Sequence, residues 1–99
     1  MKPYVFHPEA EAEFMAALVR YAAISEPLGR RFYAAIEVLL GEISSAPQRY
    51  PYVRRPVQRH FGKVFPYALI FVEQADAVAV LAVAHFRRRP GYWRSRLRG

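Results

Sequence analysis

Two apolar stretches in the second half of the sequence constrain the fold more than any other feature. Residues 65–72 (FPYALIFV) and 78–84 (VAVLAVA) are apolar at successive positions. Strands buried on both faces have this composition, because successive side chains point to opposite sides of a sheet. The intervening residues 74–76 (QAD) suit a hairpin loop. We therefore expect an antiparallel pair of strands at the centre of a sheet.

The first half of the chain predicts a strand and two helices. Residues 4–6 are a short β-favouring stretch, and Pro8 suits the first position of a helix whose early glutamates complement the helix dipole. Apolar residues repeat at helical spacing as far as Tyr21, and a second such stripe covers residues 28–43. Because only residues 25–29 interrupt this pattern, we expect two antiparallel helices.

A less apolar segment connects the helices to the central strands. Residues 44–47 (SSAP) end the second helix, and residues 48–51 have the composition of a loop. Residues 53–60 (VRRPVQRH) contain a proline, so we expect an edge strand or one arm of a hairpin there. The expected fold is α+β: an N-terminal strand, an antiparallel two-helix hairpin, and then a three-stranded antiparallel segment that completes one sheet.

Composition favours one globular domain formed by residues 1–99. The sequence is 54% hydrophobic and 15% aromatic, which is enough for a single core. It has no Cys, which excludes disulfides and fits a reducing compartment. No apolar run approaches the ~20 residues of a membrane span, and the N-terminus lacks the apolar region of a signal peptide. We expect a soluble cytoplasmic protein with a core that includes Phe14, Leu18, Phe32, Ile36, Leu39, Leu69 and Leu81.

Positive charge is concentrated in the second half of the chain. The net charge is +7, and residues 47–99 hold eleven of the fifteen Lys and Arg residues. Six of these bases and the one Trp lie in the last fifteen residues. Guanidinium groups pair with phosphates or carboxylates, and aromatic rings stack on flat partners. This pattern predicts an anionic partner, either nucleic acid or an acidic protein, although a solvated tail that serves solubility would have the same charge.

Several motifs occur in a characteristic order along the chain. They are the opening strand, two amphipathic helices, a strand with paired arginines, Phe65-Pro66-Tyr67 before an apolar strand, and Val80–His85 followed by Arg88-x-Pro90-x-x-Trp93-x-x-Arg96. In this order the motifs resemble the RelE/ParE superfamily of toxins from bacterial type II toxin-antitoxin modules, over essentially the whole chain. The resemblance implies two helices against a sheet whose opposite, concave face contacts the target. It also implies a co-expressed cognate antitoxin that wraps and neutralises the toxin, in a toxin-antitoxin hetero-oligomer.

The superfamily divides by mechanism, and the residues bear on both branches. RelE-like toxins cut messenger RNA on the ribosome, whereas ParE-like toxins poison DNA gyrase without a hydrolytic site. RNA cleavage needs an acid, a base and a cation for the phosphorane. His85 is the best acid or base, because imidazole titrates near neutral pH. For phosphate stabilisation the candidates are Arg59, Arg88 and Arg89, and for nucleotide stacking they are Tyr67 and Tyr92.

The ParE-like branch is favoured by one position in particular. Nucleolytic relatives carry an arginine early in the first apolar strand, where this sequence has Ala68. His85 also fits a structural role at the end of a buried strand, where it would bind a backbone carbonyl. We therefore expect a plasmid stabilisation-type toxin that inhibits gyrase and is not an enzyme. The alternatives are an endoribonuclease that uses His85, Arg59 and Arg88, and a non-toxic basic nucleic-acid-binding protein of the same fold.

The candidate binding residues form two groups. One group would bind the target and the other the antitoxin. Trp93 either contacts the target or caps the core. We expect no cofactor and no metal site, since His7, His60 and His85 are scattered and lack supporting carboxylates. The expected target-binding residues are Arg87, Arg88, Arg89, Tyr92, Trp93 and Arg96, and the expected antitoxin-binding residues are Arg54, Arg55 and Arg59.

Overall fold

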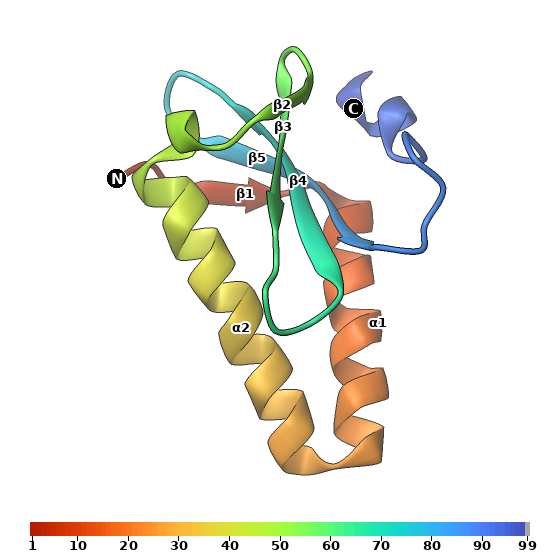
Figure 1. Ribbon diagram of the computed structural model, residues 1–99. Coiled ribbons are helices and arrows are strands. Elements are labelled where there is room, and N and C mark those ends of the chain that lie inside the picture. Colours follow the sequence, from red (N-terminus) through yellow and green to blue (C-terminus); the bar gives the residue numbers. More distant parts are fainter. Residues whose placement is uncertain (99) are drawn as a thin grey trace.

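The computed structural model describes residues 1–98 and contains two helices packed on one five-stranded sheet (Figure 1). This is the α+β architecture that the sequence predicts. No helix of the described residues has the length and apolar character needed to cross a membrane. The elements in chain order are β1 (Tyr4–Phe6), α1 (Pro8–Ile24), α2 (Glu26–Ser45), η1 (Pro47–Arg49), β2 (Tyr52–Arg54), β3 (Val57–Phe61), β4 (Tyr67–Glu73), β5 (Val78–His85) and η2 (Arg94–Arg98), where η denotes a 3₁₀ helix.

The sheet has the strand order β1-β5-β4-β3-β2, with the two strands predicted from the apolar stretches at its centre. β1 pairs with β5 in parallel, and the other pairs are antiparallel. The structure corrects the expected three-stranded antiparallel segment, because four strands follow the helices. Residues 53–60 fold back on themselves at Pro56, which lacks an N–H for a sheet and favours a turn. Of the two expectations for these residues, a single edge strand is wrong, and a hairpin arm is correct for β3, which pairs with both β2 and β4.

A single serine joins the two helices. Ser25 ends α1 and begins α2, where its Oγ accepts a hydrogen bond of 3.1 Å from the backbone N–H of Leu28. Gly29 lies where the helices approach each other, since a Cβ on it would meet the Cβ of Ala22 at 2.8 Å. The connection is thus shorter than the expected break at residues 25–29, and the last turn of α1 packs closely against the first turn of α2.

Two clusters of buried side chains lie on the two faces of the sheet. The larger one joins both helices to the sheet and includes Phe14, Phe32 and Leu69. The smaller one, on the opposite face, joins β3, β4 and β5 to Trp93 of the C-terminal segment. Of the expected core residues, Leu18 is only partly buried and the others are buried. Trp93 therefore caps the second cluster, so the C-terminal segment folds back onto the sheet.

A β-bulge in β5 shapes this second face. Ile70 pairs with Ala82 while the next residue, Phe71, pairs with Val80, so Leu81 is an extra residue in β5. As a result Leu81 and its neighbour Ala82 both belong to the cluster that packs against Trp93. The bulge thus places the largest apolar side chain of this part of β5 under the C-terminal segment.

Candidate binding surface

The face of the sheet opposite the helices carries a hollow of about 170 Å³. Strand alternation turns Ala68 and Ile70 of β4, together with Ala84 of β5, toward this face. Because two of these three side chains are alanine methyl groups, they leave space above the sheet. Trp93 closes the hollow on the side of the C-terminal segment. The floor of the hollow is therefore apolar.

Arginines held against aromatic rings border the hollow. The guanidinium of Arg88 lies 3.8 Å from the ring centroid of Tyr92, and that of Arg59 lies 4.5 Å from the ring centroid of Phe61. Such cation–π contacts orient a charge. The guanidinium of Arg88 also forms an ion pair with Glu13 of α1 at 3.7 Å. The buried Nε of Arg59 has no hydrogen-bond partner among the described residues. Arg89 also borders the hollow, and Arg87 is exposed beside it.

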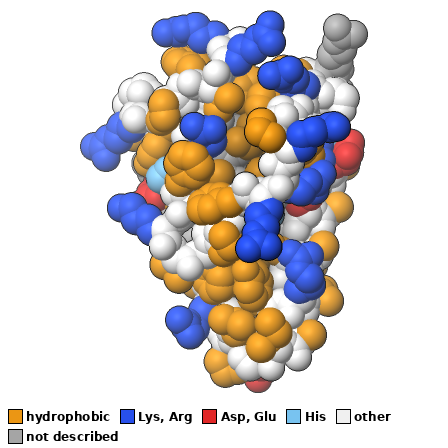
Figure 2. All heavy atoms as spheres, turned by 45° about the vertical axis from the view of Figure 1, so that its right-hand side comes forward, with side chains coloured by type: hydrophobic (Ala, Val, Ile, Leu, Met, Phe, Trp, Pro, Cys, Tyr) orange, Lys and Arg blue, Asp and Glu red, His pale blue; other side chains and the backbone are white. Residues whose placement is uncertain are grey.

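The same side of the molecule is basic on a larger scale. Figure 2 shows Lys and Arg side chains gathered over the upper part of the molecule, where the sheet and the C-terminal segment lie. Hydrophobic side chains lie between these cations and over the lower part, which the helices form. The described residues that line the hollow include no carboxylate. The hollow therefore combines an apolar floor with a cationic rim.

His85 borders this hollow, but its ring does not face it. The imidazole packs edge-on against Tyr67 at 5.0 Å between centroids, and the Tyr67 hydroxyl accepts a 2.6 Å hydrogen bond from Arg20 of α1. Alternation along β5 turns Ala84 toward the hollow and His85 toward the helices. The Nδ1 of His85 accepts a hydrogen bond from the backbone N–H of Arg87 rather than contacting a backbone carbonyl as expected. The structure thus separates His85 from Arg59.

The C-terminal segment is anchored by a carboxylate of α1, and this anchor involves Arg96. Arg96 is 7% exposed, and its guanidinium donates to both carboxylate oxygens of Glu13 at 3.0 and 2.9 Å. Its Nη1 also donates to the backbone carbonyl of the bulged residue Leu81. The expectation that Arg96 contacts a target is therefore corrected, because its side chain is buried inside the protein.

Two further groups donate hydrogen bonds to Glu13, and Arg88 forms an ion pair with it at 3.7 Å. The hydroxyl of Tyr92 donates to Glu13 at 2.8 Å, and the backbone N–H of Val83 donates at 3.0 Å. The pairing of β5 with the short strand β1 ends at Val80, so no β1 residue pairs with Val83. Glu13 supplies the hydrogen-bond acceptor that a neighbouring strand would otherwise give to Val83. We call Glu13, Tyr92 and Arg96 the Glu13 anchor. Tyr92 joins it through its hydroxyl while its ring supports Arg88.

The pKa values of the anchor follow from burial and from the carboxylate. Burial raises the pKa of the Tyr92 hydroxyl well above its usual value, and the hydrogen bond to Glu13 and the charge of Glu13 raise it further. Burial alone would lower the pKa of Arg96, but the hydrogen bonds and negative charge of Glu13 outweigh burial and raise it. Tyr92 therefore stays protonated, and Arg96 stays charged, throughout the neutral range.

The three arginines expected to bind an antitoxin lie in two places. Arg54 and Arg55 are exposed near the turn of the β2–β3 hairpin, whereas Arg59 lines the hollow. Arg94 of η2 lines a cavity of about 300 Å³ together with Arg54 and Arg55. The sequence does not predict this cluster of arginines, because the two segments are far apart in the chain. Within residues 1–98, no three His, Asp or Glu side chains gather as a metal site would require.

Comparison with known proteins links this geometry to a solved structure. No protein family model matches the sequence, and no curated protein matches it either. The fold is similar to that of a chain from the chromosomal ParDE toxin-antitoxin system of P. aeruginosa, with a TM-score of 0.73. The chain has the fold of that toxin-antitoxin protein. The alignment covers 86% of this chain and 96% of the other at 13% sequence identity, and it confirms the fold that the RelE/ParE resemblance implies.

Proposed function

We propose that this chain is the toxin of a type II toxin-antitoxin module of the plasmid stabilisation type, neutralised in the cytoplasm by a cognate antitoxin. The observation that supports this proposal is the similarity of nearly the whole chain to a protein of a ParDE system. The basic surface, within a net charge of +7, suits an acidic antitoxin. Growth inhibition would then follow when the antitoxin is lost.

Within this proposal the toxin acts by binding DNA gyrase and not by cleaving RNA. The hollow offers an apolar floor and the cations Arg59, Arg88 and Arg89, which suit adhesion to a polar or anionic surface. General acid–base catalysis requires a proton-transfer group within hydrogen-bond reach of the reacting atoms. The His85 ring packs against Tyr67 on the other side of the sheet from Arg59, so the arginines lack that partner.

The alternative function is ribosome-dependent cleavage of messenger RNA. The observation in its favour is that Arg59 and Arg88 border the same hollow, as a phosphate-binding pair would. A non-toxic basic nucleic-acid-binding protein is the third candidate, and it predicts normal growth after induction of the chain.

Induction of the toxin in cells, with and without the antitoxin encoded beside it, tests the proposal directly. We expect growth arrest with DNA breaks and gyrase cleavage complexes, relieved by the antitoxin. Arrest with intact DNA and messages cut on the ribosome would support the ribonuclease instead. Unimpaired growth would support the third candidate.

Charge reversal at the hollow tests whether its arginines bind gyrase. Arg88→Glu with Arg89→Glu should weaken gyrase inhibition roughly tenfold or more, because each charge-assisted hydrogen bond contributes about 1.5–3 kcal/mol. The matched control is Arg30→Glu with Arg31→Glu, which changes the net charge equally at exposed positions of α2. Inhibition of supercoiling by purified, folded variants is the measurement.

His85→Ala provides the complementary variant. A gyrase inhibitor should lose little activity, since one hydrogen bond contributes about 0.5–1.5 kcal/mol. A ribonuclease that depends on His85 should lose about 100- to 10,000-fold in rate. A folded His85→Ala protein that neither arrests growth nor cleaves messages would therefore overturn the gyrase proposal.

A further inference from the structure

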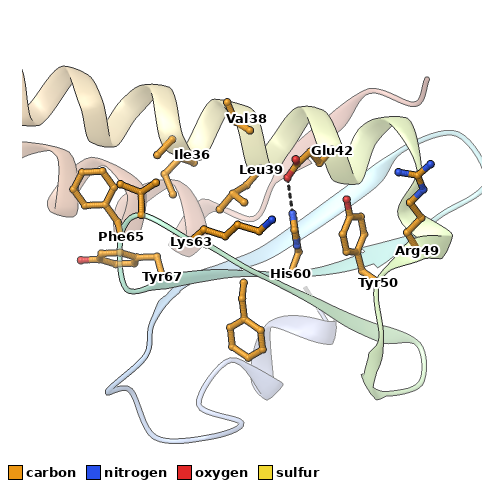
Figure 3. Close-up of a pocket in the computed structure, with 14 residues that line it drawn as sticks. Ile36, Val38, Leu39, Glu42, Arg49, Tyr50, His60, Lys63, Phe65 and Tyr67 are labelled. Carbon is orange, nitrogen blue, oxygen red and sulfur yellow. Dashed lines mark hydrogen bonds and ion pairs between the residues drawn. The ribbon is translucent and has the colours of Figure 1, made fainter.

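A second cavity, of about 440 Å³, lies on the helix side of the sheet between α2 and the β3–β4 connection (Figure 3). We call it the α2 groove. Ile36 and Leu39 of α2 face Phe65 and Tyr67 across it, so its base is apolar. This volume and lining are typical of sites that bind another molecule.

The end of the groove near η1 is polar. The Nε2 of His60 lies 2.7 Å from Oε1 of Glu42, which ties β3 to the last turns of α2. The ring of Tyr50 packs against His60 with 4.0 Å between centroids and a tilt of 34° between the ring planes. Figure 3 shows these three side chains side by side, with Arg49 beyond them. The groove thus has an apolar portion and a polar end held by internal contacts.

Apolar surface continues outside the groove, which indicates the size of its occupant. Val38 and Val64 line the groove, yet they are 59% and 70% exposed, and Phe61 is 49% exposed. A small molecule that filled the groove would leave most of this surface in water. A polypeptide segment that lies along α2 and the β3–β4 connection would cover it.

The charges around the groove favour an acidic segment. Arg49 and Lys63 line the groove from its two sides and are exposed, while its one lining carboxylate, Glu42, contacts His60. The excess of cations at the rim would attract carboxylates and oppose a second copy of this +7 chain. Charge and shape together favour an acidic, partly apolar peptide.

Phe61 connects the groove with the basic face. Phe61 borders both cavities, and its pairing with Ala68 turns its side chain to the face of the hollow, where its ring meets Phe86 edge-on at 5.5 Å. A segment that leaves the groove past the β3–β4 end of the sheet therefore reaches the hollow over this pair of aromatic rings. One continuous peptide can occupy both sites.

We infer that the α2 groove binds an apolar segment of the antitoxin, with acidic residues of that segment beside Arg49 and Lys63. This inference rests on the proposed toxin function and adds to it the site at which the partner binds. The segment covers Val38 and Val64, crosses Phe61 and shields the hollow. Neutralisation is then steric, because the groove anchors a chain that extends over the target-binding face.

The lack of cysteine in the sequence allows a direct footprinting experiment. Single variants Val38→Cys and Val64→Cys place a thiol at the groove, and Val19→Cys places a control thiol on α1, where the valine is similarly exposed at 64%. The rate of alkylation by iodoacetamide is measured for each variant alone and with the antitoxin encoded beside the toxin. We expect roughly tenfold slower alkylation at positions 38 and 64 in the complex, and an unchanged rate at position 19.

The outcomes distinguish the inference from the function on which it rests. If the wild-type chain binds the antitoxin but alkylation at positions 38 and 64 is not slowed, the groove is not the site and only the inference is wrong. If the wild-type chain does not bind it, the toxin function fails and the inference fails with it. A rate that falls as the toxin alone is concentrated would show that a second copy covers the groove, and would also overturn the inference.

Charge reversal at the rim gives a second measurement. Arg49→Glu with Lys63→Glu should weaken antitoxin binding by roughly tenfold or more. Arg30→Glu with Arg31→Glu again provides the control with the same change in net charge, and it should bind within about threefold of wild type. Equal weakening by both pairs would show that net charge alone matters and that the rim has no particular role.

Discussion

At the scale of single residues, Glu13 has a role that its position in the sequence does not reveal. It looks like one of several glutamates that favour the start of a helix, and it lies in α1 as expected. Its carboxylate nevertheless accepts hydrogen bonds from Val83, Tyr92 and Arg96, about 70 to 83 positions away. Local periodicity predicts where such a residue lies on a helix, but a contact at that separation depends on the assembled fold.

Replacement of Glu13 should unfold the protein more readily than its place near a helix start suggests. Glu13→Gln removes the nearer of the two carboxylates that pair with the buried guanidinium of Arg96 and leaves the exposed Glu9 at 3.5 Å, so we expect a loss of about 3 kcal/mol in the free energy of unfolding. Glu11→Gln is the control, because Glu11 is exposed in the same helix. Urea unfolding followed by circular dichroism measures both.

The double variant tests whether the charge pair explains the effect. Glu13→Gln with Arg96→Met removes both charges, so it should be more stable than Glu13→Gln alone. If the two losses simply add, Glu13 stabilises the fold through Val83 and Tyr92 and not through Arg96.

At the scale of elements, the sequence pattern predicts the helices and the central strands but not the hairpin β2–β3. The helical stripes and the two apolar stretches each bury a face, so their spacing reports their structure. Residues 52–54 are all exposed, so no burial pattern marks β2. Without such a pattern, the sequence predicts that Pro56 interrupts one strand, whereas Pro56 lies in the turn between two strands.

The turn between β3 and β4 depends on a glycine. A Cβ at Gly62 would lie 2.8 Å from the carbonyl oxygen of Tyr67 and 3.0 Å from that of Phe65. Both are backbone atoms, and the N–H of Gly62 already donates to the Tyr67 carbonyl. We therefore expect Gly62→Ala to lower the free energy of unfolding by about 1–3 kcal/mol, measured by thermal or urea unfolding.

Gly41→Ala is the matched control for that variant. Gly41 lies inside α2, and a Cβ there would meet no atom within 4 Å. Because alanine favours a helix over glycine by about 1 kcal/mol, Gly41→Ala should stabilise the protein. Equal destabilisation by both substitutions would contradict the assigned geometry of the β3–β4 turn.

At the scale of the whole molecule, the sequence predicted the location of the basic surface but not its internal arrangement. The cluster of arginines near the C-terminal end does lie beside the hollow. Alternation along β5 turns His85 away from that cluster, and folding of the C-terminal segment onto the sheet buries Trp93 and Arg96 within it. Residue type and spacing indicate which side chains lie near each other in the fold. The face of the sheet to which each side chain points depends on the strand register, and the bulge at Leu81 alters that register.

The overall charge predicts how the chain would meet the proposed antitoxin. A surface of net charge +7 accelerates encounter with an acidic partner, and salt screens this attraction over about 8 Å at physiological ionic strength. The association rate constant measured by stopped flow should therefore fall as salt is added, with a smaller change in the dissociation rate constant. A rate constant unaffected between low and physiological salt would indicate that apolar contacts control the encounter.

The parallel pairing of β1 with β5 has a consequence for the order in which the molecule assembles. Tyr4 pairs with Val78, 74 positions later, so the first strand has no neighbour until nearly all of the chain has been synthesised. The helix hairpin and the β4–β5 hairpin involve only local contacts and form faster than this closure. During synthesis both hairpins can therefore form while the edge of β5 that pairs with β1 is still open. Under the proposed function, an antitoxin already in the cell could therefore meet the chain before β1 closes the edge of the sheet beside β5.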